Sequence, residues 1–180
     1  MGVTRASGRR PRGHASSGAA PRPVACAIIT VSDTRRGAED TSGATIERLL
    51  VAEGHRVAVR AWVKDDAPAI RRATGAALRR REVDVVLVTG GTGVAPRDVT
   101  PEALAPLVER ALPGFGEVFR VFSLADVGTA AWLSRAGAGI ANGRLLVWLP
   151  GSRRAVELAL KRVLLPELAH LIGLLGRFPT

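Results

Sequence analysis

The sequence predicts an α/β domain of three layers, αβα, in which a mostly parallel sheet lies between helices and a hairpin adds an antiparallel strand. Two short apolar runs, at 24–31 and 83–89, have the length of buried strands. Segments with helix start signals lie between the strands, as the crossover connections of parallel strands require. The Asn-Gly pair at 142–143 is instead typical of a two-residue hairpin turn.

The run 24–31 predicts the first strand, which is followed by a polar loop. Thr41 or Ser42 is suited to cap a first helix that extends to about Glu53. Apolar residues alternate with others at 57–63, which predicts a second strand with one face partly exposed.

A second helix is indicated by Asp65 and Asp66, which precede Pro68. Acidic residues and an early proline are common at helix starts, and this helix should end near Arg81. The third strand then covers 83–89.

The same signals predict the elements of the second half of the chain. They are a helix from 100 to about 112, a turn at 113–117 followed by a helix at 118–125, a short helix at 130–135, a hairpin around 142–143 with a second arm at 145–149, and a long helical region after 150–152 that is bent or divided at Pro166.

Residues 1–23 differ in composition from the rest of the chain. They hold five arginines, no acidic residue and many small residues, which predicts a disordered basic tail ahead of a single domain at 24–180. The tail lacks the apolar stretch of a secretory signal, so we expect a cytoplasmic protein. No apolar run reaches the roughly 18 residues of a membrane span, so no membrane partner is expected.

The net charge of +10 raises the possibility of nucleic-acid binding. Outside the tail, however, 21 basic residues face 16 acidic ones, and the chain has no tyrosine and only 4% aromatic residues. Base stacking needs aromatic side chains, so we do not expect a nucleic-acid partner. Cys26 is the only cysteine and lies in an apolar run, where it should be buried. The three histidines are scattered without ligand spacing, so we do not expect a zinc site.

The segment 89–101 carries the most informative pattern. Its glycines remove side chains that would keep a ligand from the backbone, and free N–H groups in such a loop bind anions, usually phosphate. Asp98 would repel that anion unless a cation lay between them, so we predict a magnesium-assisted phosphate site. The alternative is a tight turn in which Asp98 caps the next helix. The candidate ligand-binding residues of the loop are Thr89, Gly90, Gly91, Thr92 and Gly93.

Polar loops follow four of the predicted strands, and ligands of open parallel sheets bind beyond the carboxyl ends of the strands. The four loops are Ser32-Asp33-Thr34, Asp65-Asp66, 89–98 and Pro150-Gly151-Ser152. We expect them to form one rim. Capping or a simple turn remains the alternative for each of these aspartates, with Asp65 favoured over Asp66 as the acid free to bind.

A second anion site is expected at Ser152, where a helix begins after Gly151. Arg153 and Arg154 either clamp that anion or are solvated helix residues. Common nucleotide folds are excluded, because the chain has no Walker motif and Pro96 stands where a dinucleotide loop has its third glycine.

Several of these motifs together resemble the molybdopterin-binding family, which includes adenylyltransferases and the B-type proteins of molybdenum cofactor biosynthesis. The motifs are Val31-Ser-Asp-Thr34, Asp40-Thr-Ser-Gly43, Thr89-Gly-Gly-Thr-Gly93, Arg97-Asp98-Val-Thr-Pro-Glu102, Leu112-Pro-Gly-Phe-Gly-Glu117 and Leu149-Pro-Gly-Ser152. The resemblance covers about residues 24 to 175, and the family has the αβα fold already expected.

The resemblance implies adenylylation of molybdopterin, with ATP as co-substrate and Mg²⁺ as cofactor. Asp65 and Asp98 match the acids that serve the metal and catalysis. The loop 90–93 and Gly151-Ser152 match phosphate- and pterin-binding turns. Family members form homotrimers or homohexamers, and a molybdenum insertase is a possible partner. A non-catalytic molybdopterin carrier is the alternative function.

Overall fold

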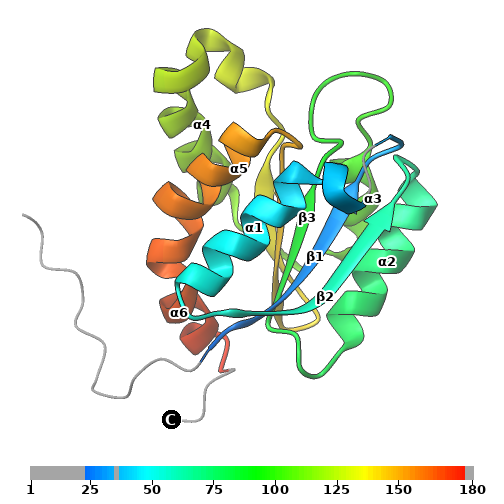
Figure 1. The fold of residues 1–180 in the computed structure, drawn as a ribbon, viewed down its shortest axis with the longest axis vertical. Helices are drawn as coiled ribbons and strands as arrows, with labels where there is room; N and C mark the ends of the chain where they lie inside the picture. Colours follow the sequence, from blue (N-terminus) through cyan, green and yellow to red (C-terminus); the bar gives the residue numbers. More distant parts are fainter. Residues whose placement is uncertain (1–22, 35–36, 177–180) are drawn as a thin grey trace, which may run out of the picture.

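A six-stranded mixed sheet forms the centre of the molecule, in the order β2-β1-β3-β6-β5-β4 (Figure 1). The computed structural model describes residues 23–34 and 37–176. The strands are β1 (Ala25–Val31), β2 (Arg56–Val63), β3 (Val85–Thr89), β4 (Arg110–Ala111), β5 (Gly137–Ala141) and β6 (Arg144–Leu149). The pairs β1·β2, β1·β3 and β3·β6 are parallel, whereas β4·β5 and β5·β6 are antiparallel.

Helices cover both faces of the sheet, which confirms the predicted αβα fold (Figure 1). The α-helices are α1 (Thr41–Ala52), α2 (Ala67–Arg79), α3 (Thr100–Leu104), α4 (Pro113–Val127), α5 (Arg153–Ala159) and α6 (Leu165–Leu174). Between them lie the 3-10 turns η1 (Gly37–Glu39), η2 (Ala105–Leu107) and η3 (Gly128–Leu133) and the π-helical turn η4 (Leu160–Leu164). α1, α4, α5 and α6 share one apolar core, and α2 and α3 share the other.

Strand β1 shows why the sequence contains continuous apolar runs. All seven of its residues are buried, and successive side chains point to opposite faces of the sheet. Cys26 and Ile28 therefore pack under α1, whereas Ala27 and Ile29 pack under α2. Burial, together with the negative charge of nearby Asp84, raises the pKa of the Cys26 thiol to about 12, so this cysteine is an inert core residue.

The helix predicted from 100 to 112 is wrong. α3 ends at Leu104, because Pro106 has no N–H and its ring would clash with a carbonyl one turn back. The chain then forms η2 and the short edge strand β4. Backbone bonds from Glu109 N to Ile140 O (2.8 Å) and from Leu112 N to Ala138 O (2.9 Å) attach this segment to β5.

Other elements differ from the prediction in a boundary or in type, among them β3, which begins at Val85, and α2, which ends at Arg79. α4 already begins at Pro113, since proline fits the first turn of a helix, so the expected turn at 113–117 is helical. The short helix predicted at 130–135 is the 3-10 turn η3. α1 is capped by Asp40 instead of Thr41 or Ser42, because the Asp40 carboxylate accepts the N–H of Gly43.

The hairpin and the divided C-terminal helix are confirmed. Asn142 and Gly143 have φ of 50° and 64°, the left-handed conformation of a tight hairpin turn between β5 and β6. The last helical region is interrupted by η4 just before α6, which has Pro166 in its first turn. Residues 1–22 of the predicted tail lie outside the described residues, and no helix within 23–34 or 37–176 is long and apolar enough to cross a membrane.

Candidate functional site

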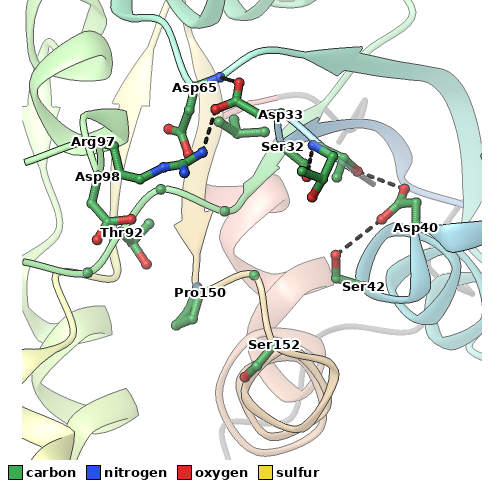
Figure 2. A pocket seen from close by; sticks show the side chains of 17 residues that line it. Ser32, Asp33, Asp40, Ser42, Asp65, Thr92, Arg97, Asp98, Pro150 and Ser152 are labelled. Atoms are coloured by element: carbon green, nitrogen blue, oxygen red, sulfur yellow. Dashed lines mark hydrogen bonds and ion pairs between the residues drawn. The ribbon is translucent and has the colours of Figure 1, made fainter. Parts of the chain in front are cut away.

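A pocket of about 450 Å³ lies at the carboxyl ends of β1, β2, β3 and β6 (Figure 2). Each of the four strands contributes the loop that follows it, so the rim expected from the sequence exists. The lining residues are Thr30, Val31, Ser32, Asp33, Thr34, Asp40, Ser42, Asp65, Gly90, Gly91, Thr92, Gly93, Arg97, Asp98, Pro150, Gly151 and Ser152.

All but one of the predicted site residues line this pocket. The exception is Thr89, which is fully buried beneath it and donates its hydroxyl hydrogen to the carbonyl of Pro150 at 2.9 Å. Thr89 therefore joins the loops after β3 and β6. The two adjacent acids have different positions, as expected. Asp66 caps α2 by accepting the N–H of Ala69 (2.9 Å), and Asp65 faces the pocket.

The glycines of the loop after β3 are needed for close packing within the protein. Gly90 and Gly91 have φ of 110° and 62°, which side chains rarely tolerate. A Cβ at Gly90 would lie 2.2 Å from the carbonyl oxygen of Val31. A Cβ at Gly91 would lie 2.6 Å from both Asp65 Oδ1 and Thr100 Oγ1. The missing side chains let this loop approach the acid after β2.

Asp98 does not cap the following helix, so the alternative in which it serves as a helix cap is wrong. The N-cap of α3 is Val99, and no side chain bonds to that helix start. The Asp98 carboxylate instead accepts the N–H of Ala95 at 3.0 Å inside its own loop. A Cβ on Gly93 would lie 2.6 Å from Asp98 Oδ2, so this glycine leaves room for the acid.

Asp65 carries a buried oxygen, Oδ1, that has no hydrogen-bond partner. Burial raises the pKa of Asp65; Arg97 opposes this shift, while the negative charges of Asp33 and Asp98 add to it. A bound cation would compensate both the unpartnered oxygen and the clustered negative charge.

Arg97 is a pocket residue that was not among the predicted site residues. Its guanidinium pairs with Asp33 Oδ2, and Asp33 Oδ1 accepts the backbone N–H of Asp65 at 3.1 Å (Figure 2). Asp33 thus fixes an arginine and the neighbouring acid together. Its position next to Asp98 in the motif was the only sequence signal for Arg97.

Arg135 supports the loop that contains Asp98. The sequence predicted only a short helix in the region of Arg135 and gave it no role in the site. Arg135 donates to the carbonyl of Gly93 at 2.8 Å, to the carbonyl of Asp98 and to the carboxylate of Glu102. These bonds fix the backbone on both sides of the Asp98 side chain.

A second cluster of polar residues in the pocket is centred on Asp40. These residues were also absent from the predicted site residues. The carboxylate of Asp40 is 1% exposed, and its two oxygens accept five hydrogen bonds. The donors are Thr30 Oγ1 (2.8 Å), Ser42 Oγ (3.1 Å), Gly43 N (2.8 Å), Arg60 Nη2 (2.7 Å) and Trp62 Nε1 (3.1 Å). Burial alone would raise the pKa of Asp40, but the bonds from Gly43, Thr30, Ser42 and Arg60 together lower it.

The clamp proposed for Arg153 and Arg154 is not formed. Arg153 pairs with Glu157 one turn along α5 at 3.5 Å, and Arg154 forms two bonds to Asp126 at 3.0 and 3.1 Å. Neither lines the pocket, so both are ordinary surface residues of the helix. Ser152 caps α5, since its hydroxyl accepts the N–H of Ala155 at 3.3 Å.

The acids of the pocket fit a magnesium ion that is completed by other ligands. Among the described residues, no group of three or more His, Cys, Asp or Glu side chains could hold a metal. Mg²⁺ commonly uses one or two carboxylates together with water and substrate phosphates. Asp65, with its unpartnered Oδ1, and Asp98 supply such a pair.

Comparison with known proteins shows the family to which the chain belongs. Residues 27–170 match a family model described as "Probable molybdopterin binding domain". The chain belongs to the molybdopterin-binding family. Its resemblance to that family in sequence is thereby confirmed, and the match includes the loops after β1, β2, β3 and β6.

Individual members of the molybdopterin-binding family are similar over nearly their whole length. The molybdenum cofactor biosynthesis protein B of Bacillus subtilis (strain 168) is 46% identical over 154 residues, 85% of this chain and 91% of that protein. A crystal structure of a molybdenum cofactor biosynthesis protein B has a TM-score of 0.86 at 44% identity, covering 89% of this chain and all of the other. The molybdopterin biosynthesis Mog protein of Mycobacterium ulcerans has a TM-score of 0.76 at 30% identity, covering 85% and 99%.

Proposed function

We propose that this protein acts in molybdenum cofactor biosynthesis and adenylylates the terminal phosphate of molybdopterin with Mg-ATP. The observation that carries the proposal is the pair Asp65 and Asp98 beside the glycine loop. The unpartnered buried oxygen of Asp65 packs against Gly91, and Asp98 packs against Gly93, in the loop that we propose binds phosphate. Family membership and the names of the relatives support the substrate class.

In the proposed reaction, an oxygen of the molybdopterin phosphate attacks the α-phosphorus of ATP. A new P–O bond forms, the bond from the α-phosphorus to its bridging oxygen breaks, and pyrophosphate leaves. Catalysis of this kind depends on positioning and on neutralising the charge of the phosphates. Magnesium held by Asp65 and Asp98 would supply positive charge at the transferred group.

The remaining polar groups of the pocket suit phosphate binding. The backbone of Gly90 to Gly93 and the turn at Gly151-Ser152 border the pocket from two sides. Arg97 adds a positive charge near Asp65 and Asp98 (Figure 2). Ser32, Asp33 and Thr92 complete this side, and we assign all of these residues to substrate binding.

The alternative is a non-catalytic molybdopterin carrier. A carrier needs only the turns at Gly90 to Gly93 and at Gly151-Ser152, which border the pocket without any metal. The two functions differ in whether ATP is consumed.

Incubation of the purified protein with molybdopterin and Mg-ATP tests the proposal. Mass spectrometry should detect adenylylated pterin, with pyrophosphate released in equal amount. Product that does not exceed the level of a reaction without protein would refute the enzyme and leave the carrier, provided that molybdopterin still binds.

We further propose that the protein is a homotrimer or homohexamer in the cytoplasm that hands its product to a molybdenum insertase. An exposed apolar surface on α4 and η3 supports self-association. It is formed by Val118, Val121, Leu124, Val127 and Trp132, the last of which is 74% exposed. Light scattering of the purified protein would give the number of subunits.

A further inference from the structure

The side of the pocket formed by Asp40, Thr30 and Ser42 is chemically unlike the side that holds Asp98 and Arg97. In Figure 2 the Asp40–Ser42 pair lies across the pocket from these two residues. Thr30 and Ser42 are only 4% and 5% exposed, so the little surface they expose belongs to the pocket. No residue of this group was needed for the proposed phosphate chemistry.

The hydrogen bonds to Asp40 fix where the hydroxyl protons lie. Arg60, Trp62 and the N–H of Gly43 are donors only, so the carboxylate accepts all three bonds. An ionised carboxylate has no proton to give. The hydroxyls of Thr30 (2.8 Å) and Ser42 (3.1 Å) therefore donate their single protons to Asp40.

Each of these hydroxyl oxygens is left with lone pairs alone. Thr30 Oγ1 and Ser42 Oγ can accept further hydrogen bonds from a ligand but can donate none. A phosphate dianion offers only acceptors and would find no donor in these two hydroxyls. A flat heterocycle with an amino group would instead supply the missing donors.

We propose that Thr30 and Ser42 recognise an amino-substituted heterocycle of the bound substrate, and that Asp40 is the positioning residue that keeps both hydroxyls in the acceptor state. The inference rests on the proposed function, whose two substrates each contain such a group: the amino group of the pterin and that of adenine. The shared chemistry is an N–H donor, and the two sources are separated by experiment.

The packing around Asp40 shows that this arrangement is held rigidly. A Cβ on Gly43 would lie 2.1 Å from Asp40 Oδ2 and 2.8 Å from Thr30 Oγ1, so the start of α1 is pressed against the group. Arg60 is held in turn by Glu47 at 2.7 Å and lies over the ring of Trp62 at 5.1 Å. The hydroxyls thus cannot easily turn their protons toward the pocket.

Isothermal titration calorimetry on the full chain tests the inference with two matched pairs of ligands. One pair is 6-hydroxymethylpterin and 6-hydroxymethyllumazine, in which a carbonyl replaces the amino group. The other is ATP and purine riboside triphosphate, which lacks the amino group. We expect the amino compound of one pair to bind about tenfold more tightly than its partner, and that pair identifies the heterocycle.

The variants Ser42→Ala and Thr30→Val should reduce this affinity ratio to within about threefold of unity. Matched controls remove buried hydroxyls elsewhere: Ser123→Ala on α4, whose hydroxyl bonds to Phe119 O, and Thr74→Val on α2. Both controls should keep the wild-type ratio. Asp40→Asn should also lower the ratio, and circular dichroism would verify its folding; if it does not fold, the two hydroxyl variants decide.

The outcomes separate this inference from the function on which it rests. Equal binding within both pairs, or a ratio that neither hydroxyl variant changes, would overturn the recognition by Thr30 and Ser42 while leaving the proposed substrates intact. If none of the four compounds binds, the proposed function fails and the inference fails with it.

Discussion

The carboxylate of Asp33 accepts the backbone N–H of Asp65 at 3.1 Å, so the loop after β1 holds the acid that follows β2. The other oxygen of Asp33 pairs with Arg97 from the loop after β3. Three loops that are distant in the sequence are thereby linked by one side chain. The position of Asp65 in the pocket thus depends on groups beyond its own strand.

Replacement of Asp98 by asparagine should lower turnover by about 100-fold or more, because an amide supplies no negative charge for magnesium. The affinity for pterin should stay within a few-fold of wild type. Single-turnover kinetics and calorimetry would measure the two effects. Wild-type turnover in Asp98→Asn would refute the catalytic role of Asp98.

Replacement of Arg97 by glutamine should reduce turnover by about tenfold, since Asp33 loses its partner and the pocket loses a positive charge. Arg154→Gln is the matched control, because Arg154 pairs with Asp126 away from the pocket. Steady-state kinetics would compare the two variants. Equal activities would show that Arg97 has no part in the reaction.

Alanine at Gly91 should destabilise the protein by about 2 kcal/mol or more, from an unfavourable φ and a clash with Asp65 and Thr100. Gly54→Ala separates the two causes: Gly54 has φ of +76°, but a Cβ there would contact nothing within 4 Å. Urea unfolding should therefore give a smaller loss for Gly54→Ala, about 1 kcal/mol. A loss as large as that of Gly91→Ala would argue against the clash.

The charge of Asp40 should make stability depend on pH in the acid range. Its pKa is lowered in the folded protein, so its contribution is complete above the unfolded value of about 3.9 and is lost as the pH falls through the folded pKa. Asp40→Asn should lower the free energy of unfolding at pH 7 and lose less of it between pH 5 and pH 2 than wild type does. Urea titrations at several pH values would measure both. An unchanged acid dependence would contradict this assignment.

Thr74→Val should stabilise the protein by about 1 kcal/mol, because the buried Oγ1 of Thr74 has no hydrogen-bond partner. Valine has nearly the same shape, so the core around α2 should not rearrange. Thermal unfolding should show a rise of about 2–4 °C. A decrease in Tm would indicate that the hydroxyl has a partner in solution.

Local patterns predicted most of the fold and of the pocket rim. Strand β3 could be predicted because a buried strand is continuously apolar. The loop after it could be predicted because its glycines are close together in the sequence. β4 could not be predicted, since two exposed residues form a strand only through pairing with β5. Arg97 and Asp40 were overlooked as site residues for a similar reason: their partners Asp33, Arg60 and Trp62 come from other loops and strands.

The direction of the parallel strands determines where this protein can be attached to other molecules. β1 begins just after Pro23, at the end of the sheet opposite the pocket, and α6 ends near that same end of the sheet (Figure 1). A tag or fluorescent domain joined directly before Pro23 or directly after Gly176 would thus leave from the side remote from the pocket. Protein immobilised on a surface through such a junction would present its pocket to solution.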